Sequence, residues 1–459
     1  MARVGRGLLA LLLLGALAGC LGREPETAIH LTWWITYAAD SDEYPAFEAI
    51  AETFTEQTGT VVELVSVPWD DIAPRGTSSR LSLLIDEGEG PDLWGPVPHT
   101  WLEPYVSREQ AMVLTPEQVR SYSQYDTLAL YASRLGGEQY ALPILIDSVA
   151  LIYNRALVPK PPTTFEQLLE VAREHTHPES ERWGLVLPLL SPTHLYPFMD
   201  GYGGYAFACQ VAAAPPSQLD SPSQPDNPSL VDNPSLVDGP ASAGEYVCDP
   251  EDLGLNNEGA VRGVQLVSDW YTQDGLFPPA LADSSRMVEH ATQLFVSGQA
   301  AMWIDGPWVL PALRETEIDF GVASLPPLPG ASRSPRPLTV VHGLSANAQT
   351  EHPDQVLALM NHVAAPESIA ALTGALNKAP VRRDVVRQSQ LEHARNWRDQ
   401  ATSGVLLPSL PEMDVVWSPW ARALAEAVPG LRPAQEALDQ AVEQIQGALS
   451  DQTDAAAGE

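Results

Sequence analysis

Apolar and polar residues follow two different periods along the chain, which predicts alternating strands and helices. An apolar run over 28–38 suits a strand. Over 43–57 the apolar positions recur at helical spacing, and Gly59 suits the end of that helix. These positions are Phe47, Ile50, Ala51 and Phe54. Further strands are expected at 61–67 and 93–94, with a helix between them, so the order predicts a parallel, doubly wound sheet.

The helical period recurs in the second half of the chain. Amphipathic helices are expected at 257–273 and 433–449, and further helices at 165–175, 353–363, 366–376 and 381–390. Thr164 is placed to cap the helix at 165–175. Residues 451–459 follow the last helix and are expected to form a loose tail.

Residues 295–308 combine a helix end, a buried strand and a new helix start. Gly298 suits a helix C-cap, and 300–304 is a short apolar run typical of a strand covered on both faces. Pro307 favours a helix start, which places Trp308 just beyond the carboxyl end of a strand. Ligands bind at that edge of open α/β sheets. The alternative, a core aromatic at a helix–sheet junction, fits the pattern equally well.

Asp147 is the only charge in a long apolar stretch over 140–154. Two strand-like runs flank it. It is either a turn residue between two strands or a polar group with a specific partner, because a buried carboxylate must be hydrogen-bonded or paired.

The amino end reads as an export signal. Arg3 and Arg6 precede an apolar run over 8–17 that is too short to span a bilayer. Leu17-Ala18-Gly19-Cys20 follows, and resembles a bacterial lipobox, so 1–19 is expected to be removed and Cys20 lipidated. The alternative is a generic secretory signal with a chance cysteine. No other apolar run is long enough to cross a membrane, so we expect an exported, tethered chain.

Composition narrows the classes of partner. The formal net charge of -34 argues against nucleic acid and anionic membrane surfaces, which attract basic proteins. About 440 mature residues suggest two or more domains. Cysteine and histidine show no metal-type spacing, and no metal or cofactor is expected.

Cys209 and Cys248 remain once Cys20 is assigned to the anchor. In an oxidising compartment a disulfide between them is plausible. They bracket 210–247, a low-complexity segment that repeats Asn-Pro-Ser-Leu-Val-Asp at 227–232 and 233–238. Such a segment buries little apolar surface and is expected to be a surface insertion.

Several motifs together resemble one family. They are the segment Phe295–Trp308, the turn Gly88-Glu-Gly-Pro-Asp92, the run Gly203-Gly-Tyr-Ala-Phe207 and the segment Leu407–Trp417. The chain resembles the extracellular solute-binding proteins of ABC importers, above all the maltose/maltodextrin-binding proteins.

The resemblance implies an α/β, two-lobed periplasmic-binding-protein fold of type II. Each lobe would be a doubly wound mixed sheet flanked by helices, and a hinge would join them. Lobe 1 is expected at 24–145 with 327–372, and lobe 2 at 148–324 with 376–450.

The resemblance also implies a sugar site. Trp308 and Trp417 correspond to stacking platforms, and Asp147 to a hydroxyl acceptor at the crossing between lobes. Weaker candidates, for which core packing is an open alternative, are Trp34, Trp69, Asp70, His99, Thr100, Trp101 and Tyr205. The polar pattern departs from the maltose-binding group at Ala38, Ala39, Pro96, His99, Thr100, Ser191 and Thr193. The aromatic floor is therefore kept while several polar contacts differ.

The expected function is that of a lipid-anchored, monomeric, non-enzymatic receptor at the outer face of the cell membrane or in the periplasm. It would capture an oligosaccharide, such as maltodextrin, between two lobes and deliver it to an ABC permease. One alternative is a secreted glycoside hydrolase, which needs two carboxyl groups across the scissile bond. Another is a receptor for a peptide, polyamine or metal complex.

Overall fold

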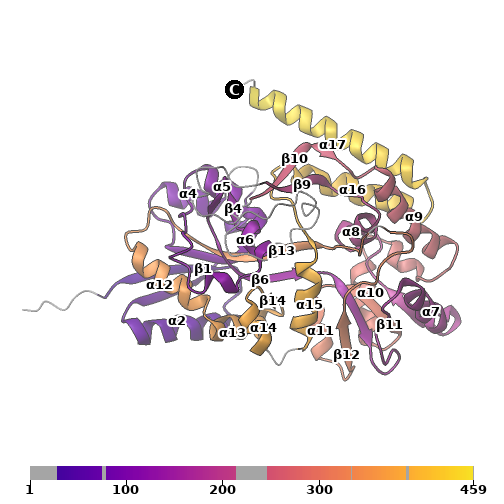
Figure 1. Cartoon of the computed structure of the whole chain (residues 1–459), viewed down its shortest axis with the longest axis horizontal. Helices are drawn as coiled ribbons and strands as arrows, with labels where there is room; N and C mark the ends of the chain where they lie inside the picture. Colours follow the sequence, from indigo (N-terminus) through magenta and orange to yellow (C-terminus); the bar gives the residue numbers. More distant parts are fainter. Residues whose placement is uncertain (1–27, 75–78, 213–244, 332, 389–391, 458–459) are drawn as a thin grey trace, which may run out of the picture.

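The computed structural model describes residues 28–74, 79–212, 245–331, 333–388 and 392–457. Two lobes lie side by side along the long axis of the molecule (Figure 1). The expected signal peptide with Cys20, and the hexapeptide repeat within 213–244, lie outside the described residues.

The first lobe is built on a mixed sheet in the order β14-β6-β13-β3-β1-β2, with β15 pairing β13. β1 is parallel to β2 and β3, whereas β13 is antiparallel to β3 and β6. The strands are β1 (His30–Ile35), β2 (Val61–Ser66), β3 (Leu93–Pro98), β6 (Leu142–Ser148), β13 (Leu338–Ala346), β14 (Ala379–Pro380) and β15 (Val405–Leu406). The expected parallel β-α-β-α-β start is confirmed.

The helices of the first lobe follow the apolar period. α2 (Tyr44–Thr58) buries the four predicted positions, and Gly59 ends it in the left-handed region at φ 76°. α12 (Pro353–Val363) and α13 (Pro366–Leu376) begin and end where they were predicted. The remaining elements are α3 (Trp69–Ile72), α4 (Arg80–Asp86), η1 (His99–Trp101), α5 (Glu103–Ser107), η2 (Tyr122–Gln124), α6 (Thr127–Ala132), β4 (Arg134–Leu135), β5 (Glu138–Gln139) and α14 (Arg383–Gln388).

The second lobe has a four-stranded sheet in the order β12-β7-β11-β8. Its strands are β7 (Ala150–Asn154), β8 (Trp183–Val186), β11 (Ala300–Asp305) and β12 (Phe320–Ala323). The helices around it are α7 (Phe165–His175), η3 (Pro178–Ser180), α8 (Pro192–Gly201), α9 (Glu258–Thr272), η7 (Pro279–Ala282), α10 (Met287–Val296), η8 (Pro307–Val309), α11 (Leu310–Arg314), α16 (Met413–Ala427) and α17 (Ala434–Ala457). Thr164 caps α7 in a capping box, as predicted.

The chain passes between the lobes at defined points. β6 in the first sheet continues into β7 in the second with only Val149 between them. The chain returns between β12 and β13. α15 (Glu392–Thr402), which was not predicted, packs against β6 and β14 of the first sheet and β12 of the second. These crossings form the expected hinge.

Three boundaries differ from the predictions. β14 pairs with β6 and β15 with β13, so the return to lobe 2 expected at residue 376 comes too early. α17 continues to Ala457, so most of the expected loose tail is helical. Residues 210–212 and 245–247 of the expected insertion lie in strands β9 (Phe207–Ala212) and β10 (Glu245–Leu253).

β9 and β10 form an antiparallel hairpin in which Cys209 lies opposite Cys248, and a disulfide joins the two. The hairpin also reaches the first lobe, because the Gly136 amide donates to Oε1 of Glu245 at 2.7 Å.

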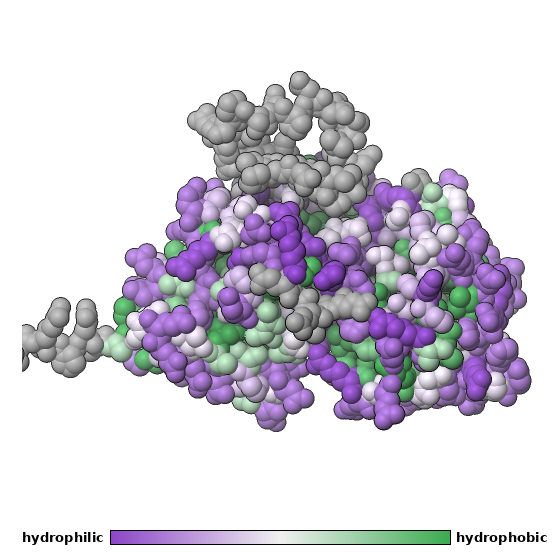
Figure 2. All heavy atoms as spheres, turned by 60° about the horizontal axis from the view of Figure 1, so that its bottom comes forward, coloured by the Kyte–Doolittle hydropathy of each residue, from purple (hydrophilic) through white to green (hydrophobic). Residues whose placement is uncertain are grey.

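Polar residues cover most of the face shown in Figure 2, and apolar residues gather in smaller areas on both lobes. No single helix among the described residues has the length and apolar composition needed to span a membrane. α12 and α13 meet that criterion only together, across a bend of 63°.

Candidate functional site

Trp308 lies where the sequence predicted it, in η8, directly after the carboxyl end of β11. Its side chain is 47% exposed, although it follows a fully buried strand. The indole lies over the backbone of Gly306, where an added Cβ would come within 2.2 Å of the ring. Gly306 therefore sets the position of the indole, which keeps surface free for a ligand.

A short polar series lies beside Trp308. The ring of His194 is 6.4 Å from the indole, edge to face. Its Nδ1 lies 2.8 Å from Oγ of Ser191, and its Nε2 lies 3.1 Å from Asp305. Ser191 precedes the first turn of α8, so this series holds a hydroxyl close to the platform.

Thr100, Trp101 and Trp417 line one cavity of about 180 Å³. Trp101 comes from η1 of the first lobe, and Trp417 from α16, which packs on α8 and α9 of the second. The ring of Trp417 stacks on that of Trp420, with 6.0 Å between the ring centroids, and Trp420 is fully buried. The cavity thus lies where the two lobes meet.

Polar groups accompany the two indoles. Glu103 and Asp414 line the same cavity, together with the hydroxyls of Thr100 and Ser409. Burial, followed by the charge of Glu412, raises the pKa of Glu103. Trp69 extends the aromatic surface, because its ring meets Trp101 edge to face at 4.2 Å and is 48% exposed. Asp70 lies next to it in the first turn of α3.

Asp147 occupies the end of β6 at the crossing between the lobes. It is 4% exposed, accepts a hydrogen bond from Nε2 of His342 at 2.9 Å and pairs with Lys378. Burial alone would raise its pKa, but the charges of Lys378 and His342 outweigh burial and hold the pKa well below its usual range. Asp147 is therefore satisfied by protein partners, and its role toward a sugar stays a prediction.

His99 is buried and links three segments. Its Nε2 donates to the Leu407 carbonyl at 3.0 Å, and its Nδ1 accepts from the Val341 amide at 3.2 Å. Burial lowers its pKa to about 4. The neutral ring thus holds the 407 segment, which leads to Trp417, against β13.

Trp34 and Tyr205, like Trp308, Asp147, Trp69, Asp70 and His99, are not among the residues that line the Trp101–Trp417 cavity. Trp34 is buried in a small apolar cluster with Ile72 and Trp94, against which Trp101 packs. Trp34 is thus part of the apolar cluster on which Trp101 packs. Tyr205 donates to Asp252 at 2.8 Å and lines a different cavity.

A family model for the bacterial extracellular solute-binding proteins matches residues 49–398, which is more than half of the chain. The chain belongs to this family. The resemblance seen in its motifs is confirmed.

The alignments with sequence relatives extend over most of the chain. The galactooligosaccharide-binding protein of Bacillus subtilis (strain 168) is 26% identical and covers 71% of this chain and 70% of its own. The maltotriose-binding protein of Pyrococcus abyssi (strain GE5 / Orsay) is 25% identical, and its alignment covers 82% of this chain and 73% of its own.

Solved structures share the two-lobed fold. A cyclo/maltodextrin-binding protein complexed with maltotetraose is 25% identical, with a TM-score of 0.73 over 93% of this chain and 99% of its own. The maltose-binding protein MalE of Listeria monocytogenes is 20% identical, with a TM-score of 0.73 over 92% and 98%. The expected fold class is confirmed.

Sequence reasoning missed the residues that support the candidates. His194 lies far from Trp308 in the chain, and His342 and Lys378 lie far from Asp147. No local pattern joins them. Asp305 directly precedes the Gly-Pro turn before Trp308, and its place at a strand end was the one available signal.

Proposed function

We propose that this protein captures an oligosaccharide of the maltodextrin type between its lobes and passes it to an ABC permease. The observation that carries the proposal is the cavity in which Trp101 and Trp417 meet from opposite lobes with Glu103 and Asp414. It supports a sugar because sugars offer apolar C–H faces to aromatic rings and hydroxyls to carboxylates.

The two indole positions suit a chain of sugar units better than a single small ion. Aromatic rings contribute binding through area and geometry, while polar groups fix orientation. Trp308 adds a half-exposed indole from the second sheet, with the Ser191 hydroxyl nearby. The relatives' ligands, galactooligosaccharide and maltotriose, support the same class.

Capture would use the hinge between β6 and β7. A ligand that contacts both lobes only when they are closed shifts the population toward the closed form. Asp147, buried at this crossing, would contribute by holding β6 and β13 together rather than by a first contact with sugar.

We further propose a lipid anchor at Cys20, no catalytic turnover and a monomeric receptor. Relatives named as maltooligosaccharide ABC transporter solute-binding lipoproteins support the anchor and the permease. A Cys20→Ser variant should be released from washed membranes while the parent chain stays bound. Release of both to the same extent would exclude the anchor.

The function is tested by a thermal-shift screen of the mature chain against mono- and oligosaccharides. A ligand at one hundred times its dissociation constant adds about 2.7 kcal/mol to the free energy of unfolding. A shift with maltodextrins and no cleavage product supports the proposal. A shift with peptides or polyamines alone, or cleaved sugar, contradicts it.

A further inference from the structure

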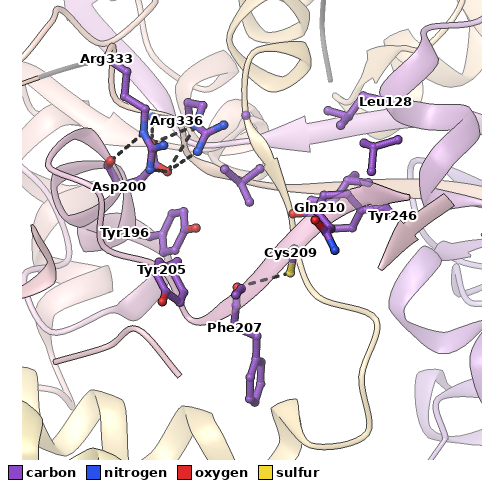
Figure 3. Close-up of a pocket in the computed structure, with 15 residues that line it drawn as sticks. Leu128, Tyr196, Asp200, Tyr205, Phe207, Cys209, Gln210, Tyr246, Arg333 and Arg336 are labelled. Atoms are coloured by element: carbon purple, nitrogen blue, oxygen red, sulfur yellow. Dashed lines mark hydrogen bonds and ion pairs between the residues drawn. The ribbon is translucent and has the colours of Figure 1, made fainter. Parts of the chain in front are cut away.

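A second cavity, of about 370 Å³, has no tryptophan among its described lining residues (Figure 3). Its walls come from α8, the β9–β10 hairpin, α6, β15 and the segment that contains Arg333 and Arg336. Arg333, Arg336 and Asp200 lie on one side of this space in Figure 3, and Leu128 and Tyr246 on the opposite side. We refer to it as the Arg333/Arg336 cavity.

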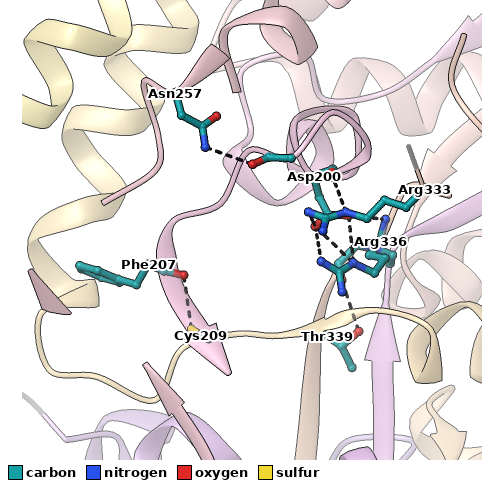
Figure 4. A network of polar contacts seen from close by, with 9 residues as sticks. Asp200, Phe207, Cys209, Asn257, Arg333, Arg336 and Thr339 are labelled. Carbon is teal, nitrogen blue, oxygen red and sulfur yellow. Dashed lines mark hydrogen bonds and ion pairs between the residues drawn. The ribbon is translucent and has the colours of Figure 1, made fainter. Parts of the chain in front are cut away.

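Two guanidinium groups share one carboxylate there (Figure 4). Nη2 of Arg333 and Nη2 of Arg336 each lie 2.9 Å from Oδ1 of Asp200. The amide and Nε of Arg336 both donate to Oδ2 at 3.1 Å. Asp200 is buried, so its charge is committed to this network.

The charges in the cavity do not balance. Among the described residues that line the cavity, Asp200 is the only carboxylate, against two arginines. The wall therefore carries one excess positive charge, in a chain whose formal net charge is -34. No hydrogen bond joins Nη1 of Arg333 or of Arg336 to a described residue, so each guanidinium keeps donors available.

Tyr196 contributes a hydroxyl to the lining of this cavity. Tyr196 is 2% exposed, and its phenol makes no hydrogen bond with the residues that the structure describes. Burial, followed by the charge of Asp200, raises its pKa well above the usual value, so it remains a hydroxyl that can donate. In Figure 3 its oxygen turns toward the open space. The hydroxyl can therefore donate to a ligand that enters the cavity.

We propose that the Arg333/Arg336 cavity binds a small oxyanion, a carboxylate or a phosphate. Its oxygens would accept from the free guanidinium nitrogens and from the Tyr196 hydroxyl, and its charge would balance the excess. Arginine suits such ligands because its planar fork matches their oxygens. The proposal does not depend on the sugar site.

The test is isothermal titration of the full mature chain with sodium phosphate and, separately, sodium acetate, against sodium chloride at equal ionic strength. We expect saturable binding of at least one oxyanion and none of chloride. Tyr196→Phe removes only the hydroxyl and should weaken binding about tenfold. Arg333→Gln should weaken it further.

Arg262→Gln is the matched control, because Arg262 lies over the Tyr202 ring at 4.0 Å and does not line the cavity. Its oxyanion affinity should equal that of the parent chain. Binding of phosphate alone identifies phosphate as the class, and binding of acetate identifies carboxylates. The proposal would be overturned if phosphate and acetate bind no better than chloride. It would also be overturned if Tyr196→Phe and Arg333→Gln both bind the oxyanion as tightly as the parent chain does.

Discussion

Nε2 of His342 in β13 donates a hydrogen bond to Asp147 in β6 across 2.9 Å, at the point where the chain leaves the first sheet. Lys378, just before β14, pairs with the same carboxylate. The two antiparallel strands are thus tied by a buried charge network next to Val149, where β6 passes into β7. Asp147 belongs to the hinge itself.

Removing one charge of this network should destabilise the fold. Lys378→Met leaves Asp147 buried with only His342, and breaking a buried pair costs about 3–5 kcal/mol. Urea unfolding measures the loss. Arg173→Met removes an exposed pair with Asp274 instead and should cost less than about 1 kcal/mol. Equal effects of the two variants would show that Asp147 is not held in this way.

Lowering the pH should reduce the free energy of unfolding, because His99 takes up a proton more readily in the unfolded chain. Its folded pKa, about 4, lies below the value of a free histidine, so the unfolded chain binds the proton more tightly. The stability linked to His99 is present above about pH 6.5 and is lost as the pH falls toward 4, by up to about 3 kcal/mol. The free energy of unfolding measured over this range should fall.

His99→Gln should make that fall shallower, whereas a substitution of the exposed His30 should leave it unchanged. In the parent chain, protonation of His99 destabilises the fold because a protonated Nδ1 can no longer accept the hydrogen bond from the Val341 amide. An unchanged slope in His99→Gln would contradict the assignment.

Much of the fold could be predicted from local patterns. α2 buries the four apolar residues spaced for a helix, and Gly298, at φ 74°, follows α10 where a C-cap was expected. Trp308 follows β11 because a buried run, a turn and Pro307 specify strand, turn and helix in order. β14 and β15 could not be predicted, since a two-residue strand has no period and its partner is distant.

The candidate site could be predicted mainly in its aromatic part, with Thr100 as the one predicted polar residue that lines the Trp101–Trp417 cavity. Large aromatics at strand ends and loops stand out in a sequence, and Trp69, Trp101 and Trp417 do lie close together. Glu103 and Asp414 were missed, because 59 acidic residues give no means of choosing two. The partners of Asp147 and His194 depend on tertiary contacts alone.

The indoles should carry ligand affinity. Trp417→Ala and Trp308→Ala should each weaken sugar binding by about 1–3 kcal/mol, the scale of burying a large side chain, with the fold intact. Leu431→Ala is the control, because Leu431 is 78% exposed and outside the cavity. If calorimetry gives both tryptophan variants the same sugar affinity as the parent chain, the two indoles do not act as stacking platforms.

Gly306→Ala should act through Trp308. The added methyl would meet the ring at 2.2 Å, so the indole must move, while the backbone at φ -100° accepts alanine without strain. We expect weaker sugar binding with the thermal unfolding midpoint nearly unchanged. If affinity is retained, the position of the indole over Gly306 does not matter for binding.

The disulfide should stabilise the chain. Cys209 and Cys248 are 39 residues apart, and closing a loop of that size contributes about 3–4 kcal/mol in the chain-entropy model. Adding dithiothreitol should lower the unfolding midpoint of the parent chain. A double serine variant should have a low midpoint that dithiothreitol does not change; sensitivity in that variant would place the effect elsewhere.

The most direct test is isothermal titration of the mature chain with maltotriose, followed by analysis of the sugar for cleavage. We predict saturable binding at one site per chain, weakened in Trp417→Ala, with the sugar recovered intact. Absence of binding to maltotriose and to galactooligosaccharides alike, or recovery of shorter sugars, would contradict the account of an oligosaccharide receptor.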